Sequence, residues 1–195
     1  MSEVIPTSGI TQDTPKNIVL GAGTIHKGLK FSGESWNFME SLLCATSGGS
    51  TLEIKPDILD LDIDGATVKF KGGSLKVGET ATLKVNAVEI TPELLKQSIF
   101  AKEAANSTTT GYTELVSKAQ IEDGDYFEYL AYVGKRINGE PIIIIFDNAL
   151  CTSGLSLEGK NKEMSVPEIT FECYADADQA DKNVLPYHIF YPTKE

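Results

Sequence analysis

Residues 140–150 read Glu-Pro-Ile-Ile-Ile-Ile-Phe-Asp-Asn-Ala-Leu, and the rest of the fold can be worked out from this stretch. Its four isoleucines and its phenylalanine are β-branched or aromatic, which suits the pleated surface of a strand. Because no polar residue interrupts the apolar run, both faces must be covered, and we predict a central strand. Pro141 stands at the first position, where a missing N–H does little harm, and Asn148 is typical of a turn or bulge.

A second strand-like run lies just upstream at residues 126–133, Tyr-Phe-Glu-Tyr-Leu-Ala-Tyr-Val. Residues 134–139 carry glycine at both ends and separate the two runs, so we predict an antiparallel hairpin. Similar runs elsewhere predict a mainly β chain, with Gly-Ala-Gly at residues 21–23 as a turn. The further predicted strands are residues 18–20, 24–31, 59–64, 67–71, 80–90, 112–121, 155–158, 166–174 and 185–192, the last as an edge strand or an arm.

Residues 59–64, Leu-Asp-Leu-Asp-Ile-Asp, alternate between apolar and acidic side chains. This period of two predicts a half-buried strand with Asp60, Asp62 and Asp64 on its polar face. The same acids, with a glycine after them, are also typical of the first half of an EF-hand calcium loop. That loop requires a glutamate where this chain has Lys71, so we favour the strand.

Residues 91–93, Thr-Pro-Glu, form the one strong helix start: a threonine cap, a proline at the first helical position and an acid in the first turn. Leu95 and Ile99 then share a face, which carries the predicted helix over about residues 92–105. One helix among many strands must lie on a sheet.

The chain has 195 residues, enough for one hydrophobic core, and we expect a single domain over residues 1–195. Residues 1–16 are rich in Pro, Ser and Thr and have little to bury, which predicts a flexible N-terminal arm. Thr46, Ser47, Gly48 and Gly49 predict a flexible loop.

The formal net charge is −11, so the surface should repel phosphate backbones and anionic lipid. Cys44, Cys151 and Cys173 have no motif spacing, which predicts three free, mostly buried thiols and a reducing compartment. The longest apolar run, residues 142–146, is far too short to span a bilayer, and the first residues lack a signal-peptide pattern. We expect no secretion signal and no membrane anchor.

The residues give no positive sign of catalysis. Residues 21–28, Gly-Ala-Gly-Thr-Ile-His-Lys-Gly, resemble a dinucleotide-binding loop, but the third glycine is misplaced and no amphipathic helix follows. His26 and His188 stand far apart without a cluster of metal-ligand spacing, which argues against zinc. A Gly-x-Ser-x-Gly motif is absent. We therefore expect a protein that is not an enzyme, with no cofactor and no metal site.

Three stretches together resemble the phage major tail proteins, which build the tail tube of bacterial viruses and prophages. They are residues 20–31 (Leu-Gly-Ala-Gly-Thr-Ile-His-Lys-Gly-Leu-Lys-Phe), residues 43–56 (Leu-Cys-Ala-Thr-Ser-Gly-Gly-Ser-Thr-Leu-Glu-Ile-Lys-Pro) and residues 125–151, which include the central strand. The resemblance implies two antiparallel sheets that form a sandwich or partial barrel, flanked by one α-helix. It also implies hexameric rings that stack into a hollow tube, an architecture similar to that of the type VI secretion tube protein.

The resemblance gives several segments an expected role in a virion tail made in the bacterial host cytoplasm. Residues 1–16 and the loop of Thr46, Ser47, Gly48 and Gly49 would contact adjacent subunits or rings. Asp60, Asp62 and Asp64 would face the lumen, where acids let DNA pass without specific binding. The expected partners are the protein itself and other tail proteins, with no membrane.

A second hypothesis is a non-catalytic β-sandwich binding module, such as a tail-tip or carbohydrate-binding domain. Tyr126, Tyr129 and Tyr132 lie on a strand with apolar or aromatic residues on both faces. They could belong to the core, lie beneath another subunit, or form an exposed platform for a ligand. A β-rich hydrolase is the least favoured reading, because the chain has two histidines only.

Overall fold

The computed structural model describes residues 7–179, 181 and 183–193, and in these residues the chain is mainly β, as predicted. The strands are β1 (Val19–His26), β2 (Leu42–Cys44), β3 (Thr46–Asp60), β4 (Ser74–Ala87), β5 (Ala101–Glu103), β6 (Leu115–Ser117), β7 (Phe127–Arg136), β8 (Pro141–Cys151), β9 (Glu168–Cys173) and β10 (Tyr187–Phe190). The helices are α1 (Thr14–Asn17), α2 (Pro92–Ser98) and the 3₁₀ turn η1 (Asp123–Asp125).

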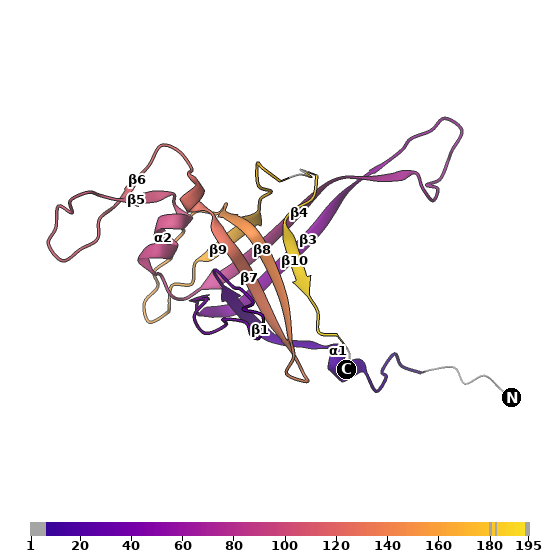
Figure 1. The fold of residues 1–195 in the computed structure, drawn as a ribbon, viewed down its shortest axis with the longest axis horizontal. Coiled ribbons are helices and arrows are strands. Elements are labelled where there is room, and N and C mark those ends of the chain that lie inside the picture. Colours follow the sequence, from indigo (N-terminus) through magenta and orange to yellow (C-terminus); the bar gives the residue numbers. More distant parts are fainter. Residues whose placement is uncertain (1–6, 180, 182, 194–195) are drawn as a thin grey trace.

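One large antiparallel sheet carries the fold, in the order β2-β1-β7-β8-β9-β4-β3, with β10 also paired to β8 (Figure 1). Strands β5 and β6 form a small second sheet. The predicted hairpin is confirmed, since β7 and β8 pair in register from Phe127 opposite Ala149 to Lys135 opposite Pro141. Strand β8 is central, because it also pairs with β9 and β10 on its other edge.

The large sheet divides at Asp147 and Asn148 of β8. Before this point, residues 143–146 pair with β10, and after it residues 149–151 pair with β9. At the division, the Asp147 N–H donates to the Pro186 carbonyl at 2.9 Å, and the Asn148 carbonyl accepts from the Tyr174 N–H at 2.9 Å. The irregularity that the sequence indicated at Asn148 is therefore the place where two strands share one edge of the central strand.

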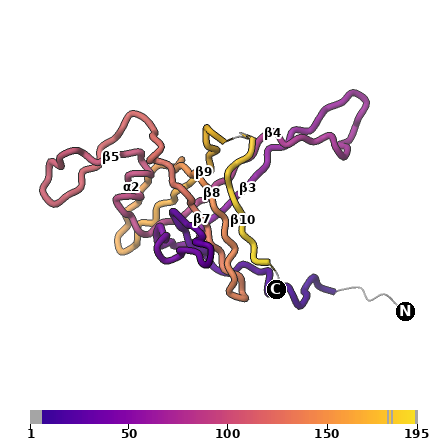
Figure 2. The backbone as a smooth tube through the Cα atoms, in the orientation of Figure 1, coloured from indigo at the N-terminus to yellow at the C-terminus, as the bar shows by residue number. Residues whose placement is uncertain are grey.

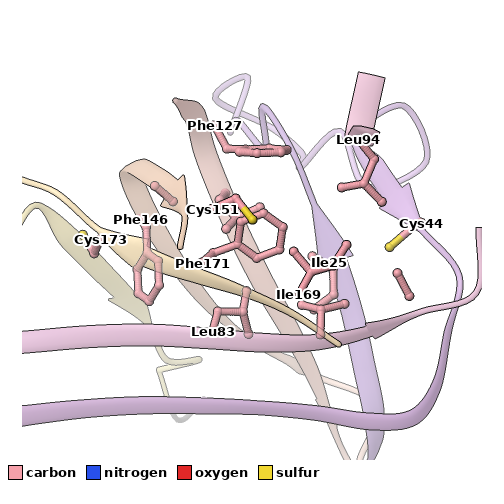
Figure 3. Close-up of a cluster of buried hydrophobic side chains, with 14 of the residues drawn as sticks. Ile25, Cys44, Leu83, Leu94, Phe127, Phe146, Cys151, Ile169, Phe171 and Cys173 are labelled. Carbon is pink, nitrogen blue, oxygen red and sulfur yellow. The ribbon is translucent and has the colours of Figure 1, made fainter. Parts of the chain in front are cut away.

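The main core lies on the concave side of the large sheet (Figure 3). The sheet curls until β3 approaches β1, where the Ser50 hydroxyl donates to the Ala22 carbonyl at 3.1 Å. Phe127 and Phe171 meet edge to face inside it, with ring centroids 4.9 Å apart, and both are almost fully buried. Of the two predicted architectures, sandwich and partial barrel, the curled sheet corresponds to the partial barrel. The three cysteines are free and buried, as expected.

The predicted glycine turn at residues 21–23 is wrong, because β1 runs through it as a single strand. Gly21 and Gly23 have φ angles of 93° and 73°, and the pairing of β1 with β7 shifts register between Leu20 and Thr24. Gly23 lies directly against the ring of Tyr132 on β7. A bulge with left-handed residues bends the strand without ending it.

Replacing Gly23 by alanine should destabilise the fold by about 2–5 kcal/mol. A Cβ there would lie 2.4 Å from Tyr132 Cε2, and alanine disfavours the left-handed φ. Gly154→Ala is the matched control, because Gly154 has a φ of 67° but open space around its Cβ, so only the smaller conformational cost remains. Denaturant unfolding measures both, and equal losses of unfolding free energy would contradict the steric argument.

The helix prediction is correct at its start and wrong at its end. The Thr91 hydroxyl accepts from the Leu94 N–H at 3.2 Å, as a cap should. Helix α2 stops at Ser98 rather than near residue 105, since Phe100 adopts a left-handed φ of 50° and the chain enters β5. Leu94 is buried in the core, whereas Ile99, which was expected on the packed face, is 45% exposed.

Several predicted strands change in length or vanish. Only Leu115–Ser117 of predicted strand 112–121 is formed, and residues 155–158 and 67–71 form no strand. Predicted strand 80–90 ends early, because β4 stops at Ala87. Strands β9 and β10 occur where predicted, with Ile169, Phe171 and Cys173 buried. Of the predicted N-terminal arm, residues 1–6 lie outside the described residues. Residues 7–13 are mostly exposed and lead away from the body, towards the end marked N in Figure 2.

Candidate assembly surfaces

A long hairpin leaves the body of the molecule and projects beyond the rest of the sheet (Figure 1). We call residues 57–77 the arm hairpin. Within it Ile58 lies opposite Lys76, Leu59 opposite Leu75, and Asp60 opposite Ser74. The Leu61 N–H then donates to the Gly73 carbonyl at 2.7 Å, which closes the ladder before the loop at the tip.

The arm hairpin is apolar on both faces and exposed on both. The large hydrophobic side chains that it exposes, each by 43–77%, are Ile58, Leu59, Leu61, Ile63, Val68, Phe70, Leu75 and Val77. An isolated two-stranded ribbon is marginally stable in water, and clustered exposed apolar side chains mark a surface that another molecule covers. The arm hairpin is therefore the strongest candidate for an assembly contact.

The predicted acidic strand at residues 59–64 is wrong, because β3 ends at Asp60. Asp62 and Asp64 lie in the exposed loop at the tip, and the neighbouring Leu61 and Ile63 face solvent rather than a core. Asp60 forms an ion pair with Lys69 and accepts from the Ser74 hydroxyl at 2.6 Å, and the Lys69 interaction is the main reason that the pKa of Asp60 is lowered. The lumen-facing role of Asp60, Asp62 and Asp64 stays a prediction, without the strand alternation from which it was inferred.

The predicted flexible loop of Thr46, Ser47, Gly48 and Gly49 is also wrong, because these residues begin β3. Gly48 and Gly49 have left-handed φ angles of 81° and 88°, and the pairing with β4 shifts register between Thr46 and Ser50. The segment is thus a bulged start of an edge strand. Within the described part of the chain, β3 pairs as a strand only with β4. Its other edge meets β1 at Ser50 and has no further strand partner there.

The three tyrosines of the proposed ligand platform do not lie together. Tyr132 packs against the main core beside Gly23, and Tyr126 meets Tyr174 edge to face at 5.9 Å. Tyr129 has a left-handed φ of 48°, and its ring lies beneath the Lys30 ammonium at 4.7 Å. The side chains therefore do not make a shared binding surface.

An apolar groove of about 980 Å³ lies on the convex face of the large sheet, opposite the main core. We call it the aromatic groove. Strand β10 and the segment after β1 flank it, and Trp36 meets Phe190 edge to face at 5.0 Å. Its apolar lining includes Leu29, Phe31, Trp36, Ile143, Ile145 and Phe190. No local motif reveals this groove, although the apolar end of the chain at residues 185–192 was expected to pack somewhere.

Polar contacts mark the two ends of the aromatic groove. At one end the Arg136 guanidinium lies over the Tyr191 ring and donates to its hydroxyl at 3.3 Å, and the Tyr191 hydroxyl donates to Asn17 Oδ1 at 3.2 Å. At the other end His188 Nε2 and Asp147 Oδ2 are 3.2 Å apart. The N-terminal helix α1 is therefore anchored beside the first end.

His26 is buried in the strand β1. Its Nε2 lies 2.8 Å from the Thr24 hydroxyl, and its Nδ1 lies 2.9 Å from the Ser41 hydroxyl. Burial lowers the pKa of His26, and a backbone hydrogen bond at Phe38 opposes this in part. The side chain is a satisfied polar group of the interior, which explains its presence without catalysis.

Stability should fall as the pH is lowered through the range in which free histidine titrates. Because the folded pKa of His26 is lowered, the unfolded chain binds the proton more readily, and stability present above pH 6.5 is lost towards the folded pKa. Denaturant unfolding at pH 7.5 and 5.5 should show a smaller difference in His26→Asn than in the parent chain. A direct NMR titration placing the His26 pKa above 6.5 would contradict this.

The described residues contain no cluster of three or more His, Cys, Asp or Glu side chains arranged to hold a metal ion. Among the same residues, no helix has both the length and the apolar character that crossing a membrane requires.

A chain of the "Virion of native gene transfer agent (GTA) particle" is structurally similar. The match has a TM-score of 0.43 and 10% sequence identity, and it covers 80% of this chain and 92% of that chain. No protein-family model matches this sequence. No curated protein matches it either.

Proposed function

We propose that the protein is a structural component of a phage or prophage virion, and that it forms hexameric rings which stack into the tail tube. The observation that carries the proposal is the arm hairpin, whose apolar side chains are exposed on both faces. A folded monomer gains nothing from such a projection, whereas a repeating assembly buries it at every contact. The resemblance of residues 20–31, 43–56 and 125–151 to major tail proteins supports the same role.

The sheet edges provide the second element of a ring. Strands β2 and β3 end the large sheet, and the 15-residue β3 offers a long unpaired edge among the described residues. Pairing of edges between neighbouring subunits would close the partial barrels into one continuous wall and remove the edges. The net charge of −11 suits a conduit through which DNA passes without specific binding. The role is not enzymatic and involves other tail proteins but no membrane.

The decisive experiment is negative-stain electron microscopy over a concentration series, with light scattering on the same samples. We expect rings or tubes with a central channel and a scattering mass that rises with concentration. Particles of closed sixfold rings without stacking would limit the proposal to the ring. A monomer at every concentration, also after addition of a purified tail initiator complex, would overturn it.

The aromatic groove favours one alternative, a non-catalytic binding module of a virion or a carbohydrate-binding domain. Trp36, Phe31 and Tyr191 line the groove, and aromatic rings can stack on sugar faces. This reading predicts a monomer that binds glycans on an array, with binding lost in Trp36→Ala. If the protein forms tubes and binds no glycan on the array, the result supports the tail-tube role over the binding module.

A further inference from the structure

The aromatic groove is a concave apolar surface that the described part of the chain leaves exposed. Its floor is formed by Ile143 and Ile145 of β8, which are only 2% and 4% exposed, and its rim includes Trp36 and Phe190, whose rings contact each other. Phe190 is 44% exposed and Phe31 is 53% exposed. Concave apolar surfaces of this size are typical binding sites for a short apolar segment or ligand.

The N-terminal segment is rooted at one end of this groove. The Tyr191 hydroxyl, which belongs to the groove lining, donates to Asn17 Oδ1 at 3.2 Å, and Asn17 ends helix α1. The residues before the described ones read Met-Ser-Glu-Val-Ile-Pro. Val4, Ile5 and Pro6 are thus an apolar triplet on a polar segment, and β-branched residues and proline favour the extended backbone that fits a groove.

The direction of the chain indicates which groove the triplet can reach. Residues 7–13 lead away from the body, as the start of the tube in Figure 2 shows, and Ile10 is 77% exposed. The twelve steps from Asn17 to Ile5 span at most about 40 Å when extended. The outward course of residues 7–13 (Figure 2) favours the groove of a second copy over the chain's own groove.

Charge at the groove fits the same segment. Lys30 lines the groove, and its ammonium lies over the Tyr129 ring. Glu3 stands directly before the apolar triplet. When Val4 and Ile5 lie over the groove floor, Glu3 can approach Lys30 and add a modest attraction to the burial of the apolar side chains.

We propose that Val4, Ile5 and Pro6 of one subunit occupy the aromatic groove of a second copy of the chain. This proposal rests on the proposed self-assembly and names one contact within it. Each subunit then contributes one apolar segment and one groove, so the contact is head to tail and repeats along the assembly. The groove serves the polymer and not a foreign ligand.

Trp36 is the one tryptophan of the chain, and it lines the groove, so its fluorescence reports occupancy directly. The test uses full-length chains carrying Ile5→Cys and Trp36→Phe, with a nitroxide quencher on the new thiol. These are mixed with unlabelled wild-type chains, so that every emitting Trp36 belongs to another copy. We expect Trp36 emission in the assembled fraction to fall in proportion to the share of labelled chains. A nitroxide on Met164→Cys, at a 72% exposed site outside the groove lining, should leave the emission nearly unchanged.

A second pair of variants tests the apolar triplet without touching the folded body. Val4→Asp with Ile5→Asp should leave Trp36 open to acrylamide quenching at concentrations where the wild-type chain is protected. Thr7→Asp with Ser8→Asp adds the same charge to the same segment and should keep the protection. Circular dichroism of both double variants shows whether they remain folded, so that a loss of folding cannot imitate the result.

Light scattering on the same samples separates this contact from the proposed function. Assembly without quenching by the Ile5 label overturns the groove contact and leaves the tail-tube role standing. Quenching between two copies without larger polymers supports the contact and counts against the tube. If neither quenching nor assembly is seen, the groove contact and the tail-tube role are both overturned. Strong quenching within dilute, singly labelled chains that retain Trp36 would show that the segment covers its own groove, and it would also overturn the proposal.

Discussion

Replacing Val68 and Val77 by aspartate should abolish polymer formation while the subunit stays folded. These side chains are 77% and 62% exposed on the arm hairpin, so the folded monomer loses almost no burial. In the polymer, each valine is expected to contribute about 1.5–3 kcal/mol through burial, and a buried unpaired carboxylate adds a further cost. Because every subunit repeats the contact, the critical concentration for polymer formation should rise by several orders of magnitude. Sedimentation and electron microscopy measure this critical concentration.

Met164→Asp is the matched control for the arm hairpin. Met164 is 72% exposed and lies outside the arm, so one added carboxylate there should leave the critical concentration for polymer formation nearly unchanged. Circular dichroism and thermal unfolding must show that all variants remain folded. If the double variant, Val68→Asp with Val77→Asp, forms polymers at the same critical concentration as the wild-type chain, the arm hairpin is not an assembly contact.

Phe171→Ala should destabilise the subunit by about 3–5 kcal/mol. Phe171 is 1% exposed and meets Phe127 edge to face at 4.9 Å, so its removal leaves a cavity at the centre of the core. Domains have total stabilities of about 5–15 kcal/mol, and the variant should therefore be close to unfolding at growth temperature. Denaturant unfolding of the purified protein gives the free energy directly.

Phe70→Ala provides the comparison for this loss. Phe70 is 43% exposed near the tip of the arm hairpin, and its removal should change the unfolding free energy of the monomer by much less than the removal of Phe171. Similar losses for the two variants would mean that the arm hairpin belongs to the cooperative unit of the monomer. The same Phe70→Ala chain should weaken assembly, which separates the two kinds of apolar side chain.

The central strand could be predicted because its signal is complete within one stretch. Residues 140–150 are apolar on both faces, and the structure covers both. The threonine cap of α2 is a similarly local signal and is confirmed. The end of α2 could not be predicted, because the left-handed Phe100 and the pairing of β5 with β6 depend on residues farther along the chain.

Residues 59–64 show the opposite case. Alternating apolar and acidic residues indicate that the apolar face of the segment will be covered. They do not indicate whether the same subunit or another molecule covers it. Here the body of the subunit does not cover that face, and Leu61 and Ile63 are exposed. The aromatic groove could not be predicted at all, because Trp36, Ile143 and Phe190 meet only in the folded sheet.

The division of the large sheet at Asp147 has a consequence for biosynthesis. The central strand β8 acquires its partner β10 only when residues 187–190 have been made, and β1 must wait for β7. Pairing between distant segments is slow, so the sheet is completed only after nearly the whole chain exists. We expect prematurely terminated chains to lack a finished sheet and to be lost to proteolysis. The order of synthesis would thus favour the removal of chains that end before β10 is made.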